Sequence, residues 1–263
     1  MKYIFLVLLF ISSLHGSLVK SPIVSVDDLE ATIVIEKIDV GMSGFIVHQL
    51  DEKHSSILKK IVVTSYDKES KVATLKMSDY DLVNNPALPK GNWEVKVGDI
   101  AVLAFGYSRA LLVSPSENIY SKITKSTQGI EWIHPDIFAT MLSFNGHPTP
   151  LKSDFNEMCN VTSVGILFFY LDKKVFTLDC QSFKILNISE AILQEKKSKL
   201  PFYSRVADID ANWWGEGSDE LKEFTPHYYE LMVKNNKNNK NLFDIISNNE
   251  KTDNLVKYFE IKE

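Results

Sequence analysis

The stretch Cys159–Leu186, CNVTSVGILFFYLDKKVFTLDCQSFKIL, constrains the fold of this chain more than any other. Two β-favouring runs flank a polar break at Asp172-Lys173, a pattern typical of a β-hairpin. With those two residues as the loop, one face carries the apolar cross-strand pairs Phe169 with Phe176 and Leu167 with Leu178. The opposite face carries the pairs Ile166 with Asp179, Phe168 with Thr177 and Tyr170 with Val175. We therefore expect one face to be core and the other to be partly covered. Asp-Lys is not the favoured Asn-Gly turn, so a slip of one residue in the loop remains open.

The two cysteines of the chain, Cys159 and Cys180, bracket this hairpin. In an exported chain such a pair favours a disulfide, which would be worth about 3 kcal/mol on the loop-entropy model. Cys180 would face Gly165, and the six residues from Cys159 to Gly165 span about 20 Å when extended. The bridge therefore requires the chain to bend at Asn160–Ser163. Two separately buried thiols, or a reactive or metal-binding thiol, are the alternatives.

The first sixteen residues have the pattern of a secretory signal peptide. Lys2 precedes the apolar run Tyr3–Ile11, and a small residue, Gly16, stands at the expected cleavage point. A retained membrane anchor is the alternative, but the run is short for a span. No later segment is apolar for long enough to span a bilayer, so we expect a mature chain without a transmembrane span, in the periplasm or at the cell surface.

Composition and motifs exclude several classes of function. The chain has 263 residues and a formal net charge of −5, so it has no general electrostatic attraction to nucleic acid. It contains no G-x-S-x-G, H-E-x-x-H, P-loop or G-x-G-x-x-G motif. The histidines outside the signal peptide are far apart in sequence: His48, His54, His134, His147 and His227. We therefore expect neither an enzyme nor a cofactor.

Residues 24–115 are predicted to form a small β-barrel or sandwich, because short strand patterns follow one another without a helical pattern. The expected strands are Ala31–Ile38, Ser43–Leu50, Leu58–Ser65, Val72–Ser78, Val95–Ala104 and Ala110–Val113. The preceding stretch, Ser17–Leu29, has the composition of a loose leader.

Residues 116–233 are predicted to form a domain in which helices flank the hairpin, which makes the whole chain α+β. The expected helices are Ser116–Ser126, Pro135–Phe144, Leu151–Met158, Ser189–Lys199 and Thr225–Val233, with a strand at Pro201–Ile209. Residues 234–263 open with KNNKNNKN and are predicted to be an Asn/Lys-rich linker and flexible tail.

An acidic segment before the last predicted helix allows two further interpretations. Residues 208–212 resemble the start of a calcium-binding loop with Asp219 as its last ligand, but Trp213 occupies the position that requires glycine. An acidic surface turn is therefore expected, with no metal. Trp213 and Trp214 are either core aromatics or an exposed anchor for a partner.

Several segments together resemble the N-terminal domain of the plasminogen-binding protein PgbA family. They are CNVTSVGILFFY, DCQSF-x-IL, PFYSRVADIDA, GMSGFIVHQL, KVGDIAVL and ALLVSP, and the resemblance runs over about residues 30–233. It implies an exported, surface-associated protein that captures host plasminogen.

Plasminogen's kringle modules recognise a lysine ammonium beside a carboxylate, so the resemblance directs attention to lysines near acids. The candidates are Lys262 beside Glu263, Lys257 with Asp253, and Lys196, Lys197 and Lys199 near Glu195. For each of them a solvated surface lysine without a partner is the far commoner case. A periplasmic scaffold or envelope-assembly protein that binds bacterial partners is the alternative function.

Overall fold

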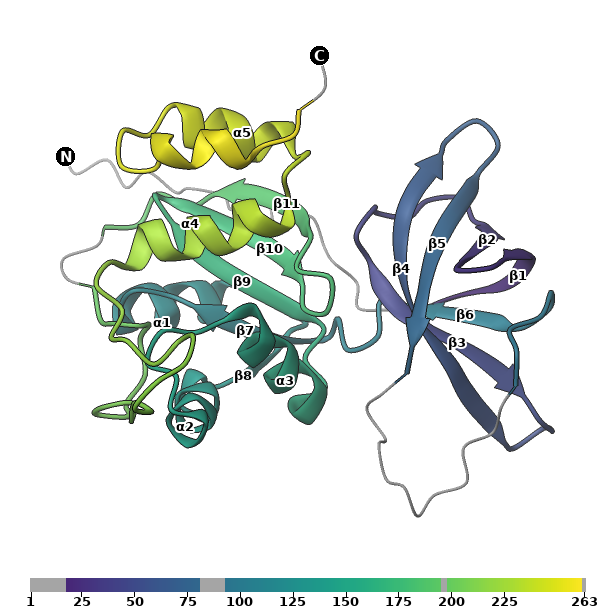
Figure 1. Cartoon of the computed structure of the whole chain (residues 1–263), viewed down its shortest axis with the longest axis horizontal. Helices are drawn as coiled ribbons and strands as arrows, with labels where there is room; N and C mark the ends of the chain where they lie inside the picture. Colours follow the sequence, from purple (N-terminus) through teal and green to yellow (C-terminus); the bar gives the residue numbers. More distant parts are fainter. Residues whose placement is uncertain (1–17, 81–92, 195–197, 262–263) are drawn as a thin grey trace, which may run out of the picture.

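The computed structural model describes residues 18–80, 93–194 and 198–261, and the predicted signal peptide lies outside them. It confirms the α+β class: a β-barrel stands beside a second sheet that is covered by helices (Figure 1). None of the helices in these ranges is long and apolar enough to cross a lipid bilayer.

The barrel is closed, antiparallel and six-stranded, with the order β1-β2-β5-β4-β3-β6. Its strands are β1 Val19–Asp27, β2 Glu30–Val34, β3 Ser43–Gln49, β4 Ser55–Asp67, β5 Val72–Asp79 and β6 Ile100–Leu103. Alternate residues fill the interior, as Ala73, Leu75 and Met77 do on β5. Register shifts in the β1–β2, β3–β4 and β4–β5 ladders mark bulges of the kind that help a sheet to curve.

The expected barrel is confirmed, but one of its expected strands is wrong. Within the stretch 17–29 that was expected to be a loose leader, residues Val19–Asp27 form β1, which closes the barrel against β6 and β2. Conversely, the segment 110–113 belongs to the second sheet. Ser21 and Ile23 face the interior, while Lys20 and Pro22 face solvent. Because β1 contains polar residues and a proline, its hydrophobicity pattern does not indicate a strand.

The second sheet has the order β11-β10-β9-β7-β8. Its strands are β7 Arg109–Val113, β8 Glu131–Ile133, β9 Ile166–Leu171, β10 Lys174–Asp179 and β11 Ile185–Glu190. β7 runs parallel to β8 and β9, and the remaining pairs are antiparallel. The helices that precede and follow the hairpin are α1 Glu117–Ser126, α2 Pro135–Asn145, α3 Lys152–Thr162 and α4 Phe224–Asn235.

The β9–β10 hairpin has the predicted register, with Phe169 opposite Phe176 and Leu167 opposite Leu178. Asp172 and Lys173 form its loop with φ values of 46° and 64°, as a two-residue turn with two positive φ angles requires. One face of the sheet packs with residues of α2, α3 and α4. The other face is more deeply buried than expected, because it joins an apolar cluster that includes residues of α1 and the barrel interior.

Two predictions after the hairpin are wrong. The segment 189–199 is not a helix: strand β11 occupies residues up to Glu190, and residues 195–197 lie outside the described part of the chain. The segment 201–209 is an irregular loop and not a strand. The helices expected over 116–126, 135–144 and 225–233 are confirmed, and that expected over 151–158 extends to Thr162.

A disulfide joins Cys159 on α3 to Cys180 just after β10, with the two Cα atoms 6.2 Å apart. Ser163 ends α3 in the left-handed region, with φ of 55°, and so produces the bend on which the bridge depends. The disulfide therefore ties α3 to the hairpin that it covers.

Asp179 joins the barrel to the second sheet and is fully buried. Its Oδ2 accepts hydrogen bonds from the Ser43 backbone nitrogen, the Ser43 hydroxyl and the Tyr107 hydroxyl, at 3.0, 2.7 and 2.8 Å. Its Oδ1 accepts from the backbone nitrogens of Gln181 and Ser182. Because Ser43 lies on β3 and Tyr107 on the β6–β7 connection, one carboxylate holds three parts of the fold together.

Candidate functional site

The C-terminal segment after α4 is folded onto the second sheet's helical layer. Where a linker and flexible tail were expected, the structure has helix α5, Lys240–Ser247, and a short 3-10 helix η1, Asp253–Tyr258. Figure 1 shows this segment in yellow, alongside α4. Leu242, Ile246 and Leu255 are buried in the same apolar cluster as α4.

Asn236, within the KNNKNNKN run, is a buried anchor of this segment. Its amide nitrogen donates to the carbonyl oxygens of Phe183 and Met232, and its oxygen accepts from the Ile185 backbone nitrogen. Asn239 caps α5 by accepting from the Leu242 backbone nitrogen at 2.9 Å. Asparagine before Leu242, Ile245 and Ile246 is a helix-start pattern that could have revealed α5 in the sequence.

The lysines predicted as plasminogen ligands differ in whether the structure describes them and in what their ammonium groups contact. Lys196, Lys197 and Lys262 lie outside the described residues. Lys199 is half-buried, and its Nζ donates to the carbonyl oxygens of Ser204 and Val206, both at 2.6 Å. The ammonium of Lys199 therefore supports its own loop and is poorly placed to enter another protein's pocket.

Lys257 is exposed on η1, and its Nζ lies 5.1 Å from the centre of the Tyr258 ring. The predicted partner was Asp253, four residues earlier. A 3-10 helix has three residues per turn, so residues four apart do not share a face as they would in an α-helix. The structure accordingly pairs Lys257 with an aromatic ring, a cation–π contact.

Two further exposed lysines are paired with carboxylates, and neither was among the lysines predicted from the sequence. On α4, Lys234 Nζ lies 2.7 Å from Glu230, and this bond raises the pKa of Lys234. Lys237 Nζ lies 2.7 Å from Glu260, beyond η1. The i,i+4 spacing of Glu230 and Lys234 was visible in the sequence. The Lys237–Glu260 pair exists only because the chain folds back.

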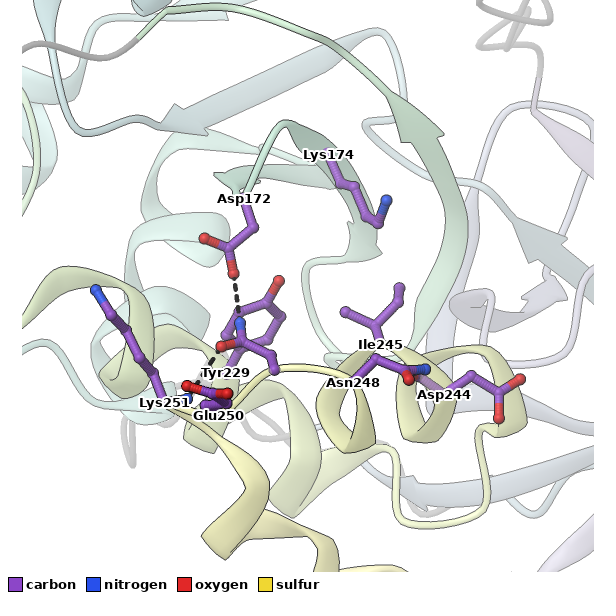
Figure 2. Close-up of a pocket in the computed structure, with 9 residues that line it drawn as sticks. Asp172, Lys174, Tyr229, Asp244, Ile245, Asn248, Glu250 and Lys251 are labelled. Carbon is purple, nitrogen blue, oxygen red and sulfur yellow. Dashed lines mark hydrogen bonds between the residues drawn. The ribbon is translucent and has the colours of Figure 1, made fainter.

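An open pocket of about 700 Å³ lies between the β9–β10 loop, α4 and α5 (Figure 2). Asp172, on the hairpin loop, accepts a hydrogen bond from the Asn249 side chain at 2.8 Å. Burial and the charge of Asp172 both raise the pKa of the Tyr229 phenol at the pocket's inner wall, so that phenol stays protonated. The lining mixes acids and lysines: Asp172, Asp244, Glu250, Lys174 and Lys251. The pocket thus marks where the segment after α5 is attached to the hairpin loop.

Trp213 and Trp214 are not core residues, since 97% and 85% of their side chains are exposed. They lie on the long loop between β11 and α4. The structure therefore supports the second of the two interpretations, an exposed aromatic pair. The acidic residue Asp210 accepts a hydrogen bond from Ser143 on α2 at 2.8 Å, which makes it part of the loop's attachment.

The fold and these surfaces define a barrel-plus-sheet protein that presents paired lysines and an aromatic loop. The chain belongs to the family whose model is described as plasminogen-binding protein pgbA N-terminal, which matches residues 18–232. That match ends within α4, so α5, η1, Lys234 and Lys237 lie beyond it.

Two curated relatives are similar to this chain, both named plasminogen-binding protein PgbA. The protein of Helicobacter pylori strain J99 is 30% identical over 202 residues, which cover 75% of this chain and 43% of the relative. That of strain 26695 is 29% identical over 204 residues, which cover 76% and 43%. The aligned region is thus less than half the length of these relatives. No solved structure matches the chain.

Proposed function

We propose that this protein is exported, is associated with the bacterial surface and captures plasminogen through exposed lysines of its C-terminal segment. The observation that carries the proposal is membership of the PgbA N-terminal family across residues 18–232. The lysines Lys234, Lys237 and Lys257 supply the chemistry, because each presents an ammonium near a carboxylate or an aromatic ring at the surface.

Release of these lysines toward a partner costs little. Exposed ion pairs contribute about 0–1 kcal/mol to stability, because water and salt screen both charges. A kringle pocket that offers its own carboxylate can therefore compete with Glu230 or Glu260 for the ammonium. Lys199 differs, because its withdrawal would leave the Ser204 and Val206 carbonyl oxygens without their present donor.

Plasminogen binding to the immobilised full chain tests the lysine mechanism. The triple variant Lys234→Ala, Lys237→Ala, Lys257→Ala is expected to lose most binding, and a free lysine analogue should compete with the wild type. The matched control is Lys53→Ala, Lys68→Ala, Lys96→Ala, which removes three exposed lysines from the barrel part of the chain. If both triple variants bind plasminogen equally well and the lysine analogue does not compete, the lysine mechanism is refuted.

The location is tested separately on intact cells. Protease added outside should degrade the protein if it reaches the surface. Protection until the outer membrane is permeabilised would instead favour the periplasmic alternative, a scaffold for bacterial partners.

A further inference from the structure

Trp213 and Trp214 form an exposed aromatic surface that the proposed lysine mechanism does not use. Water covers almost the whole of both side chains, and Phe144 at the end of α2 is also 91% exposed. Large aromatic side chains at a protein surface are the residues that most often dominate binding energy in interfaces. Leaving three of them in water, with no packing in return, is unfavourable unless a partner covers them.

The loop that carries the tryptophans is held on both sides. Before them, the Asn212 backbone nitrogen donates to the Gly146 carbonyl oxygen at 3.0 Å, and the Asn212 side chain donates to the Asn145 carbonyl oxygen at 2.6 Å. After them, the Thr149 backbone nitrogen donates to the Gly217 carbonyl oxygen at 3.1 Å. The pair therefore stands at the tip of a loop clamped to the α2–α3 connection.

That connection is itself firmly placed. His147 Nδ1 lies 2.8 Å from Asp154 Oδ1, and Asp154 is buried at the start of α3. The Thr149 hydroxyl also donates to the Asp219 carbonyl oxygen at 2.6 Å. A presenting loop of this kind loses little conformational entropy when it binds, which is an advantage for affinity.

The charge of the segment that carries the tryptophans indicates what the partner carries. Residues 208–223 hold six acids and one lysine: Asp208, Asp210, Glu216, Asp219, Glu220, Glu223 and Lys222. Each of the six acids has an exposed side chain. Carboxylates beside an indole ring favour a cation, because the ring face and the acids both attract positive charge. The same acids repel an anionic lipid surface.

We propose that the Trp213–Trp214 loop is a second docking site, and that its occupant is an arginine- or lysine-rich segment of a partner protein. The cationic side chains lie over the two indole rings, and the surrounding carboxylates pair with neighbouring positive charges. This site differs in chemistry from the C-terminal lysines, because the loop offers aromatic rings and negative charge, whereas those lysines offer positive charge. The two lie within electrostatic range, since the charge of Glu216 contributes to the raised pKa of Lys234.

An oligoarginine peptide is the probe, titrated into the full chain at low and at physiological salt. Binding is expected to weaken with salt and to shift tryptophan fluorescence to shorter wavelength as water leaves the rings. The variant Trp213→Ala, Trp214→Ala should bind at least about tenfold more weakly. Trp93→Ala, which removes a half-exposed tryptophan next to His48, is the matched control and should bind like the wild type.

A charge test separates this site from a purely apolar one. Glu216→Gln, Asp219→Asn, Glu220→Gln keeps the shape of the loop and should weaken peptide binding, whereas Glu52→Gln, Glu69→Gln, Glu94→Gln on the barrel part should not. An equal loss in both sets would show only a general charge effect and overturn the proposal. Binding to phosphatidylcholine–phosphatidylglycerol vesicles but not to the peptide, or dimerisation through the tryptophans, would also overturn it.

Discussion

Removal of the Asp179 carboxylate is expected to destabilise the protein more than any loss of a surface ion pair. In Asp179→Ala, three backbone nitrogens, those of Ser43, Gln181 and Ser182, lose their acceptor. A buried donor left unpaired costs about 1–3 kcal/mol. Because all three residues are only partly buried, water can replace some of the lost bonds. We therefore expect a loss of about 3–5 kcal/mol in the free energy of unfolding.

Urea unfolding followed by circular dichroism measures this loss. Tyr107→Phe, which removes one of the five donors and leaves the carboxylate in place, is the milder comparison, with an expected loss of about 1 kcal/mol. In the double variant Tyr107→Phe, Asp179→Ala, the losses of the two single variants should not add, since both residues belong to one network. If Asp179→Ala unfolds within about 1 kcal/mol of the wild type, the carboxylate does not hold the barrel to the sheet.

Three other outcomes follow from the core. Burial raises the pKa of the Tyr107 and Tyr228 phenols above that of an unfolded tyrosine, which is about 10. The protonated phenols therefore contribute fully to the free energy of unfolding below about pH 10. Above that pH the contribution falls by up to about 1.4 kcal/mol per phenol and pH unit. Urea midpoints should therefore fall at alkaline pH, and less steeply for Tyr107→Phe. Cys180→Ala should cost about 3 kcal/mol, and thiol titration of the denatured, unreduced wild type should detect no free thiol. Leu178→Asp should lower the thermal midpoint far more than Lys173→Asp, because Leu178 is fully buried and Lys173 lies in the exposed loop; equal midpoints would contradict the hairpin packing.

The sequence predicted those elements whose local pattern and long-range role agree. The β9–β10 hairpin is the clearest case, since its strand period and its polar break lead to the same register. β1 was missed because Ser21 and Pro22 interrupt its apolar pattern, although pairing with β6 makes it a strand. The stretch after Leu186 was wrongly predicted to be a helix because Ile188 and Ser189 suit a strand or a capped helix equally. Only pairing with β10 makes this stretch a strand.

The candidate sites were less predictable than the fold, because exposure depends on what the rest of the chain leaves uncovered. Trp213 and Trp214 suited the core at least as well as an exposed position in the sequence, and only the loop's attachment to α2 shows that they lie in solvent. The sequence around Lys199 predicts a surface lysine, yet its Nζ donates hydrogen bonds to two backbone carbonyl oxygens. The Lys237–Glu260 pair joins residues that no local spacing relates, so only the folded tail reveals it.

Truncation after Val233 tests whether the C-terminal segment belongs to the fold. The cut removes the candidate lysines, but it also removes the buried side chains of Leu242, Ile246 and Leu255 and the anchor Asn236. Fully burying one such aliphatic side chain contributes about 1.5–3 kcal/mol, so we expect the truncated chain to lose about 5 kcal/mol of stability. The triple lysine variant alters only surface groups and should unfold like the wild type. Loss of plasminogen binding in both proteins, with loss of stability in the truncated one alone, would separate the ligand role of the lysines from the structural role of the segment. A truncated chain as stable as the full one would show that α5 and η1 do not pack on α4 as described.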